Sequence, residues 1–355
     1  MEPGFRSIKD DLRTRIDTGA LPEGARVPSE NELAEQLGIS RNQTRQALRE
    51  LELEGYVTRR RGSGTFVAPR NRELATLSHA GPGAAVMIFP QYLSGYCSRV
   101  VEGFMRSMSE AGRQTITYNW QKDQASELRL LRAISDSGAA GLVAWIEHDD
   151  EETRVVVRAL RAKRFPIVLV DRYLRDVDVD CVLSDNVAIG FRLTQALLER
   201  GHRRIAFAGW FEDAPSSLRD RLEGYRRALA EAGIRYDEGL VGGALQEMEH
   251  DAVSVARAFM ALADRPTAFV CVHDRLAKLL YEPLIDLGYR VPQGVTLAAV
   301  QDRRPPERDD VPMVMLEQQA HQIGARSAKL LLQREEDPEG GPEHCLIEPA
   351  QLSEE

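Results

Sequence analysis

The sequence has few of the features that build disulfide frameworks, metal sites or membrane spans. Its 355 residues include four cysteines, which are far apart and form no C-x-x-C pair. We expect these cysteines to be reduced and mostly buried thiols, because disulfide and zinc frameworks need closely spaced pairs. No apolar run approaches membrane-spanning length, and the N-terminus has no signal-peptide core. A cytoplasmic protein without a membrane segment is predicted.

Catalytic signatures are also missing. The chain contains no G-x-S-x-G or H-E-x-x-H motif, and Gly62-Ser63-Gly64 lacks the G-K-[ST] ending of a phosphate-binding loop. Two His-Asp pairs, His148 with Asp149 and His273 with Asp274, have no third partner at a diagnostic spacing. The sequence therefore predicts a protein that is not an enzyme and that needs neither a cofactor nor a metal.

The net charge of −9 at pH 7 is unevenly distributed. Residues 1–70 hold 12 Lys and Arg against 11 Asp and Glu, whereas the remaining residues hold 34 against 44. Six arginines gather late in this N-terminal stretch, namely Arg41, Arg45, Arg49, Arg59, Arg60 and Arg61. A local basic patch on an acidic protein is compatible with specific DNA binding, and the acidic remainder limits non-specific adhesion.

Residues 30–67 have the pattern of a winged helix-turn-helix domain. Apolar residues at helical spacing predict a short helix that Gly38 ends, and Ser40 is placed to cap a second helix from Arg41 to Glu54. Two short strands follow, at 56–58 and 65–67, joined by a tight turn at 61–64. A supporting helix is expected over residues 5–17, since its apolar residues share one face. These elements predict a DNA-binding head.

The candidate DNA contacts lie on the second helix and on the wing. Arg pairs well with guanine, and Asn and Gln pair with adenine, so the start of this helix is expected to read bases. The candidates are Ser40, Arg41, Asn42, Gln43, Arg45, Arg49, Arg61 and Gly62. For Arg49 an ion pair with Glu50, Glu52 or Glu54 is an equal alternative. The wing tip at Arg61 and Gly62 can enter a minor groove or touch only phosphates.

From residue 84 onward, short apolar strands alternate with helices. The candidate strands are Ala84–Phe89, Thr115–Tyr118, Gly141–Trp145, Ile167–Val170, Cys181–Leu183, Arg204–Ala208, Leu240–Val241, Ala268–Val272 and Val295–Val300. The candidate helices are Tyr96–Ala111, Ser126–Ser137, Asp150–Arg164, Val187–Arg200, Leu218–Ala232, Asp251–Ala263 and Arg275–Leu287. This alternation predicts an α/β body with doubly wound parallel sheets, in which ligands bind beyond the carboxyl ends of the strands. The number of strands favours two lobes.

The head resembles the gluconate-repressor (GntR) family of bacterial regulators over about seventy residues. The matching motifs are Gly19-Ala20-Leu21-Pro22-Glu23-Gly24, Val27-Pro28-Ser29-Glu30, Gly38-Ile39-Ser40-Arg41, Thr44-Arg45-Gln46-Ala47-Leu48, Leu51-Glu52-Leu53-Glu54-Gly55 and Gly62-Ser63-Gly64-Thr65-Phe66-Val67. One position departs from the family, which usually has Arg where this chain has Asn31.

Residues 84–349 resemble the effector domain of the lactose/galactose-repressor (LacI/GalR) family, which is similar to periplasmic sugar-binding proteins. The matching motifs are Val168-Leu169-Val170-Asp171-Arg172, Leu183-Ser184-Asp185-Asn186, Gly201-His202-Arg203-Arg204-Ile205, Arg221-Leu222-Glu223-Gly224-Tyr225 and Asp274-Arg275-Leu276-Ala277. Two positions depart from the family: His273-Asp274 replaces an Asn-Asp pair, and Val300-Gln301-Asp302 replaces Gly-Phe-Asp. A GntR head on a LacI/GalR body is similar to the arabinose-repressor type of regulator.

The candidate effector contacts combine charged groups with aromatic rings. The resemblance implies that Arg221 binds ligand, and Asp274 and Arg172 follow strand ends, where side chains can reach sugar hydroxyls. The full set is Tyr96, Trp145, Arg172, Trp210, Arg221, His273, Asp274 and Gln301. Structural alternatives remain open: an ion pair of Arg221 with Asp220 or Glu223, an Asp171–Arg172 pair, a helix N-cap for Asp274, and a core role for each aromatic ring.

The sequence predicts a bacterial transcriptional repressor with a winged helix-turn-helix domain at 1–68, a linker at 69–83 and an effector-binding and dimerisation domain at 84–355. Lobe 1 is placed at about 84–190 and 318–346, and lobe 2 at about 191–317 and 347–355. The expected partners are double-stranded operator DNA with an inverted repeat, a carbohydrate-like effector and a second copy of the chain. The alternatives are a metabolite-binding enzyme or sensor, and a constitutive DNA binder.

Overall fold

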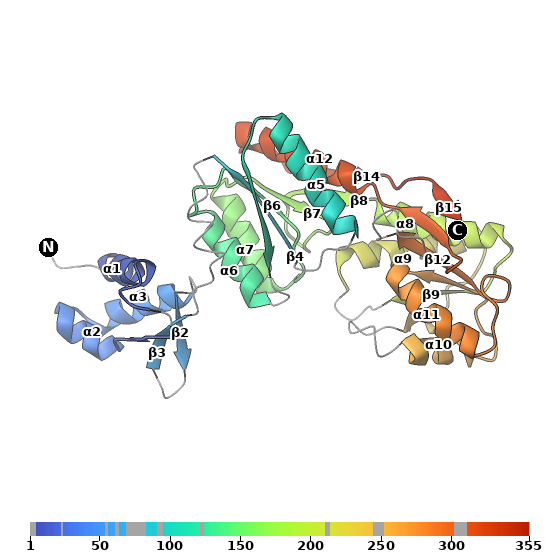
Figure 1. The fold of residues 1–355 in the computed structure, drawn as a ribbon, viewed down its shortest axis with the longest axis horizontal. Helices are drawn as coiled ribbons and strands as arrows, with labels where there is room; N and C mark the ends of the chain where they lie inside the picture. Colours follow the sequence, from blue (N-terminus) through green and yellow to red (C-terminus); the bar gives the residue numbers. More distant parts are fainter. Residues whose placement is uncertain are drawn as a thin grey trace. The chain divides into compact units, whose positions relative to one another are not determined.

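The protein is described from a computed structural model, shown in Figure 1. The described residues are 5–22, 24–53, 56–60, 64–68, 83–90, 95–120, 124–209, 214–243, 252–301 and 311–354. The chain divides into two compact units, one of residues 1–82 with 125–139 and the other of residues 83–124 with 140–355. Among the described helices, none is long and apolar enough to cross a membrane.

The head is a three-helix domain with a small antiparallel sheet. Its elements are α1 (Phe5–Asp17), β1 (Arg26–Val27), α2 (Glu30–Leu37), α3 (Arg41–Leu53), β2 (Val57–Arg60) and β3 (Gly64–Val67). The strands are ordered β1-β3-β2, and Val57 pairs with Val67 in the hairpin. The predicted supporting helix, the helix-turn-helix pair and the wing strands are therefore confirmed. The predicted turn at 61–64 and the linker at 69–83 lie largely outside the described residues.

Burial explains why these residues form the head. Ile8, Leu12 and Ile16 of α1 pack in one core with a stripe of buried residues on α3. In that stripe Thr44, Ala47, Leu48 and Leu51 are fully buried. At the end of α2, Gly38 takes a left-handed conformation with φ +67°, which a residue without a side chain adopts at little cost. The unit also contains α6 (Gln124–Ile134) apart from its first residue.

The second unit contains two six-stranded sheets, as the two-lobe prediction requires. The first has the order β14-β8-β7-β6-β4-β5 and is parallel throughout. Its strands are β4 (Ala85–Pro90), β5 (Thr115–Trp120), β6 (Gly141–Ala144), β7 (Ile167–Val170), β8 (Asp180–Ser184) and β14 (His344–Ile347). The associated helices are α5 (Gly95–Glu110), α7 (Glu151–Ala162) and α12 (Ala320–Glu336). We call this part lobe 1.

Lobe 2 is built on the sheet β10-β9-β11-β12-β13-β15. Its strands are β9 (Ile205–Gly209), β10 (Val241–Gly243), β11 (Ala268–Cys271), β12 (Thr296–Gln301), β13 (Val314–Glu317) and β15 (Leu352–Glu354). All neighbours are parallel except β15, which is antiparallel to β13. Its helices are α8 (Asn186–Glu199), α9 (Ser216–Glu231), the 3-10 turn η1 (Glu238–Leu240), α10 (Ala252–Met260) and α11 (Asp274–Asp286). The predicted α/β class with parallel sheets is confirmed.

The chain passes between the lobes three times. The passages lie between β8 and α8, between β13 and α12, and between β14 and β15. In each lobe, the helix that follows a passage packs very closely on a neighbouring helix. These pairs are α12 with α5 in lobe 1, visible in Figure 1, and α8 with α9 in lobe 2. A Cβ atom at Gly324 of α12 would lie 2.0 Å from the Val100 carbonyl oxygen of α5, and one at Gly190 of α8 would lie 1.9 Å from the Arg221 carbonyl oxygen of α9. Only glycine permits these contacts.

Candidate DNA interface and effector site

Ser40 and Gln43 cap the start of α3, the second helix of the helix-turn-helix pair and the candidate recognition helix. The Ser40 backbone N–H donates to Gln43 Oε1 at 3.1 Å, and the Gln43 N–H is 3.4 Å from Ser40 Oγ. This reciprocal arrangement is a capping box with Gln at the third helical position. Both residues were predicted as DNA contacts, and the structure adds a structural role for each. Arg41 and Asn42, the first two residues of α3, are exposed beside this cap.

Glu30 connects two arginines of the candidate DNA surface. Its Oε2 atom is 3.0 Å from Arg45 Nε, and its Oε1 atom is 3.4 Å from Arg59 Nη1. Arg59 also pairs with Glu52, at 3.1 Å. The carboxylate therefore holds cations of α3 and β2 on the same side of the domain. Arg45 remains 60% exposed and Arg49 is exposed, so both can reach a phosphate or a base. Arg61 and Gly62 lie outside the described residues.

Arg221 lies at the centre of a polar cluster where the lobes meet. Its Nε atom donates to Asn186 Oδ1 at 2.9 Å, its Nη2 to Gln318 Oε1 at 3.3 Å, and its Nη1 to the Val272 carbonyl oxygen. Ser184 Oγ also donates to Gln318 Oε1, at 2.9 Å. The acceptors come from two passages between the lobes and from the end of β11. Asn186 and Gln318 are thus site residues that the sequence analysis did not assign.

Arg172 and Asp171 pair at the carboxyl end of β7. Arg172 Nε is 3.0 Å from Asp171 Oδ2, and its Nη1 is 3.6 Å from Glu147 Oε1. The Asp171–Arg172 ion pair, which was the structural alternative for Arg172, is therefore present. Glu147 forms a second ion pair with the same guanidinium. Burial raises the pKa of Asp171, and the charges of Arg172 and Arg221 oppose that shift. Asp171 also has φ +71°, a left-handed conformation that costs a non-glycine residue free energy.

His273 and Asp274 follow β11. His273, not Asp274, caps α11, because its Nδ1 atom accepts from the Leu276 N–H at 3.0 Å. The N-cap alternative for Asp274 is wrong for this reason. The Asp274 side chain is buried, and its Oδ2 atom lies 3.8 Å from Lys278 Nζ. Burial, with the charges of Arg221 and Arg275, lowers the pKa of His273 to about 4, so its imidazole is neutral at pH 7.

The aromatic candidates that the structure describes are buried among other side chains. Tyr96 and Trp145 are each 3% exposed and meet edge to face, with ring centroids 5.5 Å apart. Both belong to the hydrophobic core of lobe 1. Stacking of either ring on an effector stays a prediction. Gln301 is the last residue of β12 and is paired in register with Glu317, while Trp210 lies outside the described residues.

Family comparisons agree with this two-part architecture. Residues 5–67 match the bacterial regulatory proteins of the gntR family, and residues 194–354 match the periplasmic binding protein-like domain. The chain is 29% identical over 338 residues to the arabinose metabolism transcriptional repressor of Geobacillus stearothermophilus, which covers 93% of this chain and 91% of the relative. Identity to the protein of the same name from Halalkalibacterium halodurans is 25%, over 98% and 95% of the two chains.

A solved structure supports the fold of the body. It is a LacI family transcriptional regulator from Enterococcus faecium with bound ribose. The TM-score is 0.64 at 20% identity, and the match covers 76% of this chain and 97% of the other. The chain therefore joins a DNA-binding domain of the gntR family of bacterial regulatory proteins to a periplasmic binding protein-like body, which is the architecture of a ligand-responsive transcriptional regulator.

Proposed function

We propose that the protein is a transcriptional repressor that leaves its operator when a small carbohydrate binds between the lobes of the body. One observation carries this proposal. The same chain contains a recognition helix whose start is exposed and a polar cluster where the two lobes meet. The relatives named above are repressors of arabinose metabolism, which makes a pentose the first effector to test. We infer that the protein acts by binding and not by catalysis.

The head supplies base and phosphate contacts from a single face. The capping box fixes the start of α3, so that Arg41 and Asn42 are presented where a recognition helix meets base edges. Arg45 and Arg59, joined through Glu30, provide positive charge beside them. In the proposed homodimer two such heads bind the halves of an inverted repeat, about 34 Å apart for one turn of DNA.

The body supplies hydrogen-bonding groups from both lobes. Arg172 belongs to lobe 1, whereas Arg221 and Asp274 belong to lobe 2. Guanidinium and carboxylate groups suit the vicinal hydroxyls of a sugar, and the neutral His273 adds a hydrogen-bonding group without a charge. A sugar that contacts both lobes favours the lobe arrangement in which these groups face one another. Operator release then requires that the sugar and the operator favour different arrangements.

Selection of bound sequences from random DNA by the full-length protein, followed by fluorescence anisotropy, tests the proposal. L-arabinose and related pentoses would then be added to the complex. Arg41→Ala should weaken binding to the selected sequence about tenfold to a hundredfold, as the loss of one base contact does. Arg15→Ala is the control, because this exposed arginine of α1 pairs with Asp11 in the same helix. Equal affinities of the two variants would refute the assigned interface, and no sugar response would refute the effector class.

A further inference from the structure

The lobes are connected by more than the three passages of the chain. The segment after β7, in lobe 1, contacts the first turns of α9, in lobe 2. Ser216 Oγ accepts from the Tyr173 N–H at 2.9 Å and donates to the Tyr173 carbonyl oxygen at 3.1 Å. The Tyr173 hydroxyl donates to Asp220 Oδ1 at 3.2 Å. Tyr173, Ser216 and Asp220 therefore join the lobes through three hydrogen bonds, and we call them the clasp.

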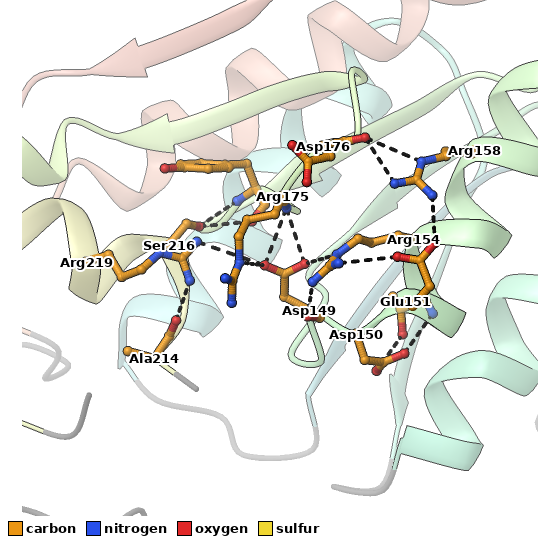
Figure 2. A network of polar contacts seen from close by, with 12 residues as sticks. Asp149, Asp150, Glu151, Arg154, Arg158, Arg175, Asp176, Ala214, Ser216 and Arg219 are labelled. Atoms are coloured by element: carbon orange, nitrogen blue, oxygen red, sulfur yellow. Dashed lines mark hydrogen bonds and ion pairs between the residues drawn. The ribbon is translucent and has the colours of Figure 1, made fainter. Parts of the chain in front are cut away.

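A group of charges beside the clasp crosses the same junction. Figure 2 shows Asp149, which follows β6, with Arg154 and Arg175 of lobe 1 and Arg219 of lobe 2 around its carboxylate. Its oxygens are 2.8 Å from Arg154 Nε and 3.3 Å from Arg175 Nε, and the Arg219 Nη2 atom lies 4.0 Å away. The hydrogen bonds from Arg154 and Arg175 lower the pKa of Asp149, although burial alone would raise it. An ionised Asp149 therefore attracts the helix that carries Ser216.

The clasp also holds a strained turn of the candidate effector site. Asp171, with φ +71°, and Arg172 immediately precede Tyr173. Ser216 bonds to both backbone groups of Tyr173, so a residue of lobe 2 fixes the end of this lobe 1 turn. On the other side of the junction, Arg221 follows Asp220 directly. Tyr173 is thus adjacent to Arg172, and Asp220 is adjacent to Arg221, and both arginines are candidate effector contacts.

We propose that Tyr173, Ser216 and Asp220 are positioning residues that clasp the lobes in the effector-binding arrangement and hold the Asp171–Arg172 turn in place. The inference rests on the proposed function, since it concerns the same effector site. With the clasp closed, Arg221 of lobe 2 is near enough to Asp171 of lobe 1 to act on its charge. An effector that bridges Arg172 and Arg221 stabilises this arrangement, and separation of the lobes must break the clasp.

Amide hydrogen exchange on the full-length chain without ligand or DNA tests the clasp directly. Tyr173→Phe removes the hydroxyl but keeps the ring, and Asp220→Ala removes its acceptor. Each variant should speed exchange over residues 171–176 about fivefold to tenfold, and the double variant should add nothing because one interaction is lost. Asp220→Asn retains an acceptor and should restore slow exchange. Tyr236→Phe is the matched control, since the Tyr236 hydroxyl bonds to Arg226 within lobe 2.

The effector link needs a second measurement on the same proteins, calorimetric titration with L-arabinose. The dissociation constant should rise about fivefold to tenfold in Tyr173→Phe and stay unchanged in Tyr236→Phe. Unchanged exchange in Tyr173→Phe, or additive effects in the double variant, would overturn the clasp. Faster exchange with an unchanged dissociation constant would overturn its role in positioning. Absence of L-arabinose binding by every protein, the unsubstituted chain included, would instead count against the proposed effector, while the exchange result would still decide the clasp.

Discussion

Replacement of Arg334 by Met should destabilise the body more than any surface substitution. Arg334 of α12 and Asp180 of β8 form a two-pronged pair, with Nε 2.7 Å from Oδ2 and Nη2 2.9 Å from Oδ1. Their side chains are 6% and 2% exposed. The remaining donors of Arg334 bond to the carbonyl oxygens of Asp337 and Gly341, so the guanidinium also fixes the turn after α12.

The expected cost follows from the charge that is left behind. Removal of one partner of a buried ion pair costs about 3–5 kcal/mol, because the other charge stays buried without compensation. Asp180 Oδ1 keeps one hydrogen bond, from the Glu343 N–H at 2.8 Å, which places Arg334→Met near the lower end, at about 3 kcal/mol. A second substitution, Asp180→Leu, removes the orphaned charge. The double variant should therefore recover most of the stability that the single variant loses.

Urea unfolding followed by tryptophan fluorescence measures the effect. All three tryptophans (Trp120, Trp145 and Trp210) lie in the body, so the signal reports this part of the chain. With a slope of about 3 kcal/mol per molar urea, the midpoint of Arg334→Met should fall by about 1 M. Arg106→Met, which breaks an exposed ion pair with Glu102, should change the urea midpoint little. Equal midpoints for the two single variants, or a double variant no more stable than Arg334→Met, would refute the reasoning.

Two further predictions concern single residues. Because the folded state keeps His273 neutral, with a pKa of about 4 against 6.5 for the free side chain, its contribution to stability is complete above pH 6.5 and is lost as pH falls toward 4. His273→Gln should flatten the pH dependence of the free energy of unfolding of the body between these pH values. An unchanged pH dependence would contradict the lowered pKa of His273. Gly38→Ala forces a side chain into the left-handed region at φ +67°, so amide exchange across α2 and α3 should accelerate about fivefold, without change in the body.

Much of the fold could be predicted because its signals are local. The bounds of β7 were predicted to the residue, and α1 lies where a helix was expected at about Phe5 to Asp17. Gly38 ends α2 and Ser40 precedes α3, as expected. In contrast, β13, β14, β15 and α12 were not predicted as elements. The three strands are only three or four residues long, and pairing with distant strands decides them. Part of the buried face of α12 is formed by Gly324, Ser327 and Ala328, which give a weak apolar pattern.

The candidate site was less predictable, because its geometry depends on residues distant in sequence. The position of Arg221 could be predicted from its motif. Its acceptors, however, lie 35, 51 and 97 residues away, at Asn186, Val272 and Gln318. Ser184-Asp185-Asn186 was visible as a motif without a role, and Gln318 follows a strand that was not predicted. The cap at His273 could not be told from one at Asp274, since both are adjacent polar residues at a helix start.

The position of Arg221 suggests how a local ligand contact can reach the whole body. Arg221 lies on α9, which packs on α8 through Gly190, while α12 packs on α5 through Gly324. Backbones this close leave little room for sliding, so each pair of helices is expected to move as one body. The guanidinium donates to Asn186, the first residue of α8, and to Gln318, just before α12. An effector that accepts hydrogen bonds from these donors therefore exchanges a direct link between the helix pairs of the two lobes for one that runs through the ligand, and occupancy of the site becomes a change in lobe arrangement.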